Sequence, residues 1–201
     1  MLVTFEGIDR SGKTTQARLL AEALGSDALL VREPGGTPAA ERIRALVKDP
    51  EVELSPIAET LLFGAARAEL VTRVIRPALD GGKVVVCDRC VDSTVAYQGG
   101  ARGLGIDRVE ELNEWITDGL WPDVTFLLDL PPAAASGRPA QPDRFEEEGE
   151  ALQHAVAAAY EVLAERHSDR YVRIDAARSV EEVHSDVLAQ VQERVRATTK
   201  R

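Results

Sequence analysis

The sequence has little that would point to a membrane-bound or nucleic-acid-binding protein. No uninterrupted apolar stretch approaches the roughly 20 residues that cross a bilayer. The amino terminus, MLVTFEGIDR, has no basic leader before an apolar run. The chain of 201 residues carries 24 Lys and Arg against 34 Asp and Glu, a net charge of -10. From the first two features we expect a cytoplasmic protein. Because the acidic balance leaves no broad basic surface, we also expect it to bind neither nucleic acid nor membrane.

Cysteine is also scarce, and the two that occur, Cys87 and Cys90, form a C-x-x-C spacing with three interpretations. A zinc site would need a second ligand pair, and the chain has only three histidines. A redox pair is the second interpretation. Since Cys87 ends an apolar run, a buried thiol followed by a loop thiol is the preferred one.

Apolar runs and helical patterns alternate along the chain. Runs typical of buried parallel strands occur at 2–5, 28–31, 83–87, 124–130 and 171–174. Helical spacing is found over 13–24, 56–79, 107–118 and 146–167. Ser179 and Glu182 then form a capping-box pattern before an amphipathic closing helix. This order predicts one α/β domain over residues 1–201, with a five-stranded parallel sheet flanked by helices on both faces.

Two segments interrupt the alternation and are rich in Pro, Gly and Arg: REPGGTP at 32–38 and PPAAASGRPAQPDR at 131–144. In parallel sheets, ligands bind where loops leave the carboxyl ends of the strands, so both segments are candidate parts of a site. The second has four prolines and few apolar side chains. It predicts a small mobile lid over about residues 131–147.

A phosphate-binding loop follows the first predicted strand and opens the first predicted helix. Its backbone N–H groups would surround phosphate oxygens, Lys13 would reach the outer phosphates, and Thr14 would bind Mg2+. Asp88, at the end of an apolar run, is placed to support the same ion, although it could simply cap the next turn. We therefore expect ATP and Mg2+ to bind. The residues that fit G-x-x-x-x-G-K-[ST] are Gly7, Ile8, Asp9, Arg10, Ser11, Gly12, Lys13 and Thr14, with Thr15 following.

Arginines favour a kinase over a nucleotide switch or a motor. The Asn/Thr-Lys-x-Asp motif of guanine-specific switches is absent. Phosphoryl transfer to an acceptor needs a second anion site facing the first, and positive charge over the transferred group. An acceptor phosphate is already largely dianionic at pH 7, so no general base is required. A single arginine is more often a surface group, but five are candidates to lie around the phosphate loop: Arg10, Arg67, Arg89, Arg138 and Arg144.

Taken together, the motifs resemble those of bacterial thymidylate kinases. They are FEGIDRSGKTTQ, REPGGT, LLFGAAR, CDRCVDSTVAYQGGARG and WPDVTFLLD, in family order, with a weaker match from DRFE at 143–146 onward. The resemblance implies the P-loop NTPase fold, a transfer of phosphate from ATP to dTMP to give dTDP, and a homodimer. A kinase for another pyrimidine monophosphate is the nearest alternative. A non-catalytic ATP-binding regulator is a distant one.

The same resemblance implies roles for individual residues. Phe63 would stack on thymine, unless it only packs in the core, while Arg67 and Gln98 would bind the polar edge of the base. Tyr97 would crowd the ribose 2′ position, and Asp9 would hold the 3′-hydroxyl. Arg44 and Arg89 would hold the acceptor phosphate. Further substrate contacts are expected from Glu33, Pro34, Ser93 and Thr94, an ATP contact from Arg138, and catalytic charge from Arg10, Lys13, Arg89 and Arg144.

The chain departs from the family pattern at three places. Cys90 stands where an aromatic residue or histidine is more usual. The lid has only Arg138 and Arg144, where many bacterial relatives have more arginines. Arg10 occupies a loop position that many relatives leave small. We therefore predict that Arg10 carries transition-state charge that relatives assign partly to the lid.

Overall fold

The computed structural model describes residues 1–137 and 144–199. Within them, one sheet of five parallel strands has the order β2-β3-β1-β4-β5. The predicted strands and the parallel α/β architecture are confirmed, and each strand end lies within one residue of its predicted position. The strands are β1 (Leu2–Glu6), β2 (Ala28–Arg32), β3 (Val84–Asp88), β4 (Val124–Asp129) and β5 (Tyr171–Asp175).

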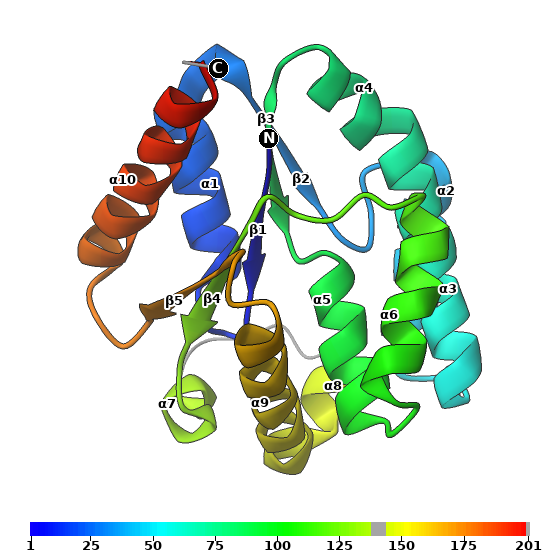
Figure 1. Cartoon of the computed structure of the whole chain (residues 1–201). Helices are drawn as coiled ribbons and strands as arrows, with labels where there is room; N and C mark the ends of the chain where they lie inside the picture. Colours follow the sequence, from blue (N-terminus) through cyan, green and yellow to red (C-terminus); the bar gives the residue numbers. More distant parts are fainter. Residues whose placement is uncertain (138–143, 200–201) are drawn as a thin grey trace.

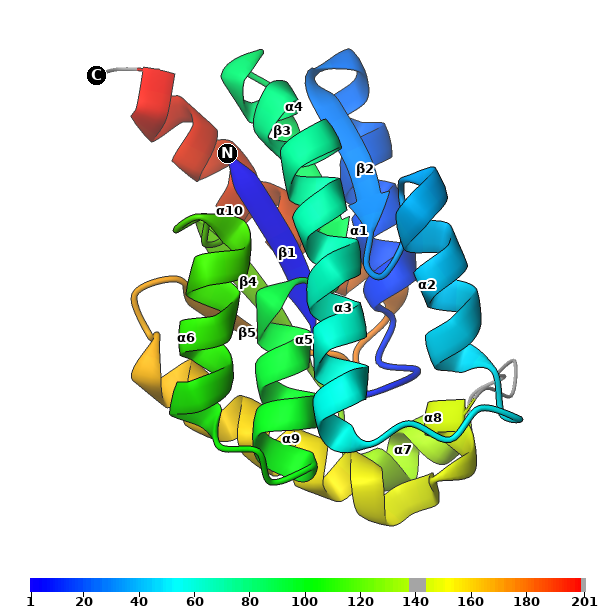
Figure 2. The ribbon, with the colours of Figure 1, turned by 90° about the vertical axis from the view of Figure 1, so that its right-hand side faces the viewer.

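Helices cover both faces of the sheet (Figure 1, Figure 2). On one face α1 (Lys13–Leu24) packs against α10 (Val180–Thr199). The other face is covered by α3 (Pro56–Leu70), α6 (Ile106–Thr117) and α9 (Gly149–Arg166). No helix in the described part of the chain has the length and apolar character needed to span a bilayer. The shorter helices are α2 (Pro38–Lys48), α4 (Arg76–Asp80), α5 (Val91–Thr94), α7 (Pro132–Ser136) and α8 (Arg144–Glu147), with a 3-10 turn at Gly25–Asp27 and π-helical turns at Val71–Ile75 and Val95–Ala101.

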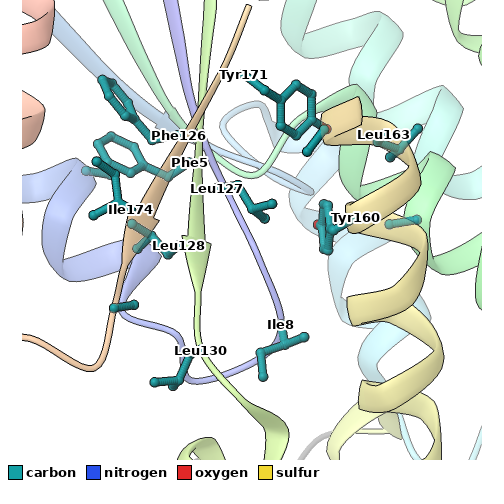
Figure 3. Packing of buried hydrophobic residues seen from close by; sticks show 14 of the residues in the cluster. Phe5, Ile8, Phe126, Leu127, Leu128, Leu130, Tyr160, Leu163, Tyr171 and Ile174 are labelled. Carbon is teal, nitrogen blue, oxygen red and sulfur yellow. The ribbon is translucent and has the colours of Figure 1, made fainter. Parts of the chain in front are cut away.

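The core lies on both sides of the sheet. Phe5 and Phe126 stack on one side, with ring centroids 5.4 Å apart, while Tyr160 and Leu163 of α9 lie on the other (Figure 3). All four side chains are buried. Because the strands are covered on both faces, their sequences are near-continuous apolar runs rather than alternating ones.

The predicted helices differ from the observed ones in a few places. The pattern over 56–79 is a helix broken by the π-helical turn at 71–75, just before Pro77, which lacks the N–H that a regular helix would use. The pattern over 146–167 is divided at Gly149, whose φ is +77°. The capping box of α10 is confirmed, since Glu182 accepts hydrogen bonds from the backbone N and Oγ of Ser179 (3.0 and 2.7 Å).

Helix α2 was not among the predicted elements. Thr37 caps it by accepting a hydrogen bond from the backbone N of Ala40 (3.1 Å), and Pro38 begins it. Its buried residues are only Ala40 and Val47. The helix begins at Pro38, the last residue of the Pro- and Gly-rich segment 32–38, which the sequence analysis interpreted as a break between elements.

The carboxyl ends of the central strands meet at one edge of the sheet, toward the bottom of Figure 1. In the register, Phe5 of β1 pairs with Asp88 of β3 and with Phe126 of β4. The loops that leave these strands therefore start at the same level. This places the phosphate loop, Arg89 and helix α7 at one edge, as expected for a ligand site in a parallel sheet.

Candidate functional site

The phosphate loop joins β1 to α1 and closes around a buried lysine. Gly7 and Gly12 have φ angles of +138° and +103°. A Cβ on Gly7 would lie 2.7 Å from the carbonyl oxygen of Leu128, so a side chain does not fit there. Lys13 Nζ donates to the Ile8 carbonyl oxygen (2.5 Å) and to Ser11 Oγ (3.3 Å). The loop thus has the curled shape that the sequence motif predicts.

The electrostatics of Lys13 favour an anion in this loop. Burial and then repulsion from Arg89 lower the pKa of the Lys13 ammonium to about 7. Burial removes the water that would otherwise stabilise the ammonium. A phosphate bound beside it would stabilise the charged form instead, and would raise the pKa of Lys13 again. The loop is therefore better matched to an anion than to water.

Thr14 and Asp88 are brought together, as the sequence predicts for a magnesium site. Thr14 Oγ1 donates to Asp88 Oδ2 over 2.5 Å, across 74 residues of sequence. A hydroxyl and a carboxylate oxygen are ligands of the kind that Mg2+ prefers. The donor set at this point fits the ion.

A pocket of about 290 Å³ opens beside the phosphate loop. Arg32, Lys48 and Phe145 line it too, although the sequence did not single them out. The structure therefore gathers the predicted acceptor contacts in one place. The predicted substrate-binding residues, all of which line this pocket, are Asp9, Glu33, Pro34, Arg44, Phe63, Arg67, Arg89, Ser93, Thr94, Tyr97 and Gln98.

Arg89 is held between the phosphate loop and this pocket. Its φ is +66°, a left-handed conformation that is uncommon outside glycine. The guanidinium donates to the Gly7 carbonyl oxygen and to Ser93 Oγ (3.2 Å each). It also donates to Asp9 Oδ1. These contacts fix the direction of the guanidinium before any substrate binds.

Asp9 has a second partner that sequence analysis missed. Gln153 of α9 accepts from the backbone N of Asp9 (3.0 Å) and donates to its Oδ2 (2.8 Å). The Tyr97 hydroxyl donates to the same oxygen (3.1 Å). Burial acts to raise the pKa of Asp9, but Arg89 and Lys13 outweigh it and hold the pKa below its usual value. Asp9 is thus a fixed anion at the junction of the loop and the pocket.

Arg67 is fully buried and has three fixed partners. Its Nε donates to Glu33 Oε2 (2.7 Å), and its terminal nitrogens donate to Asn113 Oδ1 (2.6 Å) and to the Cys90 carbonyl oxygen (3.0 Å). Glu33 is buried as well. The REPGGTP segment thus contributes Glu33, which orients Arg67, in addition to lining the pocket.

Aromatic rings form one wall of the pocket. The ring centroid of Phe145 lies 5.9 Å from that of Phe63 and 6.1 Å from that of Tyr97. Phe63 is only partly buried, so one part of its ring remains open to the pocket. Phe145 belongs to the DRFE stretch, which is the signal by which the sequence could have identified it.

The two cysteines belong to the packing around Arg67. Cys90 lies in the loop after β3, as predicted, but its side chain is buried. A hydrogen bond to Cys90 and burial raise the pKa of the Cys87 thiol well above 9.0, which makes it a poor nucleophile. The ligand atoms of Cys87, Cys90 and Glu33 lie within 4.8 Å of one another, but Glu33 is paired with Arg67. Two unreactive thiols, rather than a zinc site or a redox pair, are therefore the favoured interpretation of the C-x-x-C spacing.

A second cleft, of about 530 Å³, lies on the other side of the phosphate loop. The loop between β5 and α10 contributes Ala176 and Arg178, which sequence analysis missed although they follow a strand end. The predicted ATP-binding residues that line it are Arg10, Ser11, Gly12, Lys13, Thr14 and Thr15.

The two lid arginines have different outcomes. Arg138 lies outside the described residues. Arg144 donates to Glu59 Oε2 (2.6 Å) and to the Val47 carbonyl oxygen (3.0 Å). It is not among the residues that line either cleft. In this structure Arg144 therefore stabilises the packing of α8 against α2 and α3.

Glu6 is the most deeply buried acid near the site, and sequence analysis gave it no role. It accepts hydrogen bonds from the backbone N of Cys90 (2.7 Å), from Ser93 Oγ (2.6 Å) and from the Tyr160 hydroxyl (2.7 Å). Burial and then repulsion from Asp92 raise its pKa to about 7. Glu6 thus links the loop after β3 to helix α9.

We expect Glu6 to lower the stability of the fold as the pH rises. Its folded pKa is about 7, against 4.5 for an unperturbed carboxyl. Between these values the folded chain keeps a proton that the unfolded chain has lost, so this group makes the free energy of unfolding fall with rising pH. Compared with wild type, Glu6→Gln should remove this contribution, whereas Glu161→Gln, at a half-exposed site, should keep it.

Urea denaturation at about pH 5 and about pH 7 measures the change in the free energy of unfolding for each protein. The same change in wild type and in Glu6→Gln would contradict the assignment of Glu6.

Comparison with known proteins identifies the family. The family model described as thymidylate kinase matches residues 5–187. A thymidylate kinase of Halothermothrix orenii is 44% identical over 200 residues, covering 95% of this chain and 96% of that protein. One of Pseudomonas putida is 47% identical over 197 residues, covering 93% and 92%. The crystal structure of a thymidylate kinase from Ehrlichia chaffeensis superimposes with a TM-score of 0.78 at 34% identity, covering 95% of this chain and 98% of that one. The chain therefore belongs to the thymidylate kinase family.

Proposed function

We propose that this member of the family transfers the γ-phosphoryl group of ATP directly to the phosphate of dTMP, giving dTDP and ADP. The observation that carries the proposal is that Arg10, Lys13 and Thr14 line both clefts. An ATP phosphate held by the loop and an acceptor phosphate in the pocket would meet at these three residues. Such alignment turns the transfer into an effectively unimolecular step.

The transfer itself needs charge neutralisation more than proton transfer. An oxygen of the acceptor phosphate forms a bond to the γ-phosphorus while the bond from that phosphorus to the ADP oxygen breaks. Because the acceptor is largely dianionic at pH 7, its oxygen needs no base. Its approach to another anion is opposed by charge repulsion, which Arg10, Lys13 and Arg89 would offset.

Thr14 and Asp88 are the residues we propose to hold Mg2+. Bound there, the ion would neutralise charge on the ATP phosphates. Lys13 lies inside the phosphate loop and would contact the ATP phosphates. Asp9 pairs with Arg89 and would keep its guanidinium directed toward the acceptor pocket.

Recognition of dTMP would use the walls of the acceptor pocket. Phe63 and Phe145 offer apolar ring surface for the base, and Arg67 offers donors to its polar edge. Arg44 and Arg89 face the pocket as anion ligands for the acceptor phosphate. For the sugar, Asp9 would accept from the 3′-hydroxyl, and the Tyr97 ring would crowd the 2′ position.

Segment 131–147 is proposed to act as the lid of this single domain. In its described part, α8 already packs against α2 and α3 through Arg144. Arg138 would join ATP when the lid closes. Closure would exclude water, which otherwise competes with dTMP for the γ-phosphoryl group.

We further propose a homodimer in the cytoplasm. Ile57 and Leu61 of α3 are 58% and 53% exposed, and Trp115 of the adjacent α6 is 79% exposed. All three are large apolar side chains exposed on two neighbouring helices, and exposed apolar surface of this kind is expected at an interface. Sedimentation of the purified chain should therefore give twice its mass of 21.8 kDa. A monomer mass would contradict the dimer.

The choice of acceptor is tested with parallel substrates. We expect dTMP to be phosphorylated with a higher kcat/KM than dUMP, CMP, GMP or thymidine, measured by coupled ADP release. If another monophosphate were the better acceptor, the dTMP assignment would fail although the phosphate loop would still bind ATP. ATP binding with no transfer to any acceptor would instead support a regulator.

Arg10 is expected to supply much of the transition-state charge. Arg10→Gly should lower kcat by about 10³-fold, the scale of loss seen when an arginine over the transferred phosphoryl group is removed. The change should leave folding intact, because the φ of Arg10 is +62°, which glycine adopts freely. Steady-state kinetics and thermal melting measure the two effects. A kcat close to that of the wild type would remove this role from Arg10.

A further inference from the structure

Glu59 is a buried carboxylate at which the acceptor pocket and helix α8 meet. It lies in the first turn of α3 and is 1% exposed. It accepts hydrogen bonds from Gln98 Nε2 (2.7 Å), Arg102 Nε (3.2 Å) and Arg144 NH2 (2.6 Å). Phe63 and Arg67 follow at spacings of four and eight residues, so they share a helix face with Glu59.

The chemistry of the carboxylate fixes which way the Gln98 amide turns. An ionised carboxylate only accepts hydrogen bonds, so the NH2 group of Gln98 must face Glu59. The Oε1 atom on the other side of the planar amide is then directed away from Glu59. Gln98 lines the acceptor pocket, and no described residue donates to its Oε1. Oε1 is thus the Gln98 atom left to meet a base.

Together, Arg67 and Gln98 present a fixed pattern to a pyrimidine. Arg67 carries only donors, and Gln98 in this orientation adds an acceptor. Thymine and uracil match this pattern, because position 4 bears an acceptor oxygen and N3 bears a hydrogen. Cytosine reverses both groups, with an amino group at position 4 and a bare N3. The orientation of the Gln98 amide therefore determines one of the two contacts that distinguish thymine and uracil from cytosine.

We propose that Glu59 is a positioning residue that determines specificity: it locks the Gln98 amide so that the pocket accepts thymine and uracil and rejects cytosine. This inference rests on the proposed function, in which Gln98 faces the base. Glu59 itself touches no substrate atom in this arrangement. Its effect is exerted through the acceptor oxygen that it makes Gln98 present.

The substitution Glu59→Gln tests the lock. A glutamine keeps the size of the side chain and an oxygen for Arg102 and Arg144, but it can also donate to Gln98 Oε1. The Gln98 amide is then able to turn and offer its NH2 group to cytosine N3. We expect the ratio of kcat/KM for dTMP to that for dCMP to fall by about tenfold, the usual scale for one base-edge interaction.

dUMP serves as an internal reference, because uracil and thymine have the same edge. The kcat/KM values for dTMP and dUMP should change together in Glu59→Gln, whatever happens to overall activity. A dTMP to dCMP ratio that stays within about twofold of wild type would overturn the proposal, since loss of packing alone lowers all acceptors alike.

Glu148→Gln is the matched control. Glu148 pairs with Arg102 at the edge of the same cluster but has no hydrogen bond to Gln98. The same chemical change there should leave the dTMP to dCMP ratio at its wild-type value. A fall as large as that in Glu59→Gln would show that the network acts on specificity without the Gln98 lock, and would also overturn the proposal.

Gln98→Ala separates this inference from the proposed function. If kcat/KM for dTMP falls in Gln98→Ala while Glu59→Gln keeps the wild-type ratio, only the role of Glu59 fails. If Gln98→Ala keeps the wild-type kcat/KM for dTMP, the proposed base contact fails as well. Should Glu59→Gln melt below the assay temperature, calorimetry in the cold gives the ratio of the dissociation constants of dCMP and dTMP, which should fall relative to wild type if the proposal holds.

Discussion

Carboxylates hold the arginines around the acceptor pocket, and the geometry of that pocket depends on the pairing. A guanidinium that is buried without a partner is strongly destabilising. Asp9 pairs with Arg89, Glu33 with Arg67, and Glu59 with Arg102 and Arg144. Each acid comes from a different element than its arginine. The ion pairs therefore connect the phosphate loop with the β3 loop, the β2 loop with α3, and α3 with α8.

The fold and the phosphate loop could be predicted because their signals are local. Strands that are buried on both faces have near-continuous apolar sequences, and the phosphate loop has a recognisable motif of eight residues. The acceptor pocket was reached through the resemblance to a family. Its residues come from six separate stretches, and spacing alone does not show that Glu33 and Arg67 touch across 34 positions.

The residues that were missed share a physical reason. Glu6, Asn113 and Gln153 are polar side chains within regular elements, where a polar residue normally indicates a solvent-exposed position. Their partners lie 46 to 154 residues away in sequence. Only the packing of α6 and α9 onto the sheet brings them to the site. Cys90 is the reverse case: its unusual identity was noticed, but its burial was not predicted.

The two arginines that we propose to face the phosphates, Arg10 and Arg89, have left-handed backbone, at φ +62° and +66°. For a side chain other than glycine, such a conformation costs on the order of 1 kcal/mol or more. Selection for stability therefore favours glycine at these positions, whereas the proposed role in turnover requires arginine. A library screened only for thermal resistance would accumulate glycine or asparagine there, and would lose the charge that we propose for the transfer step.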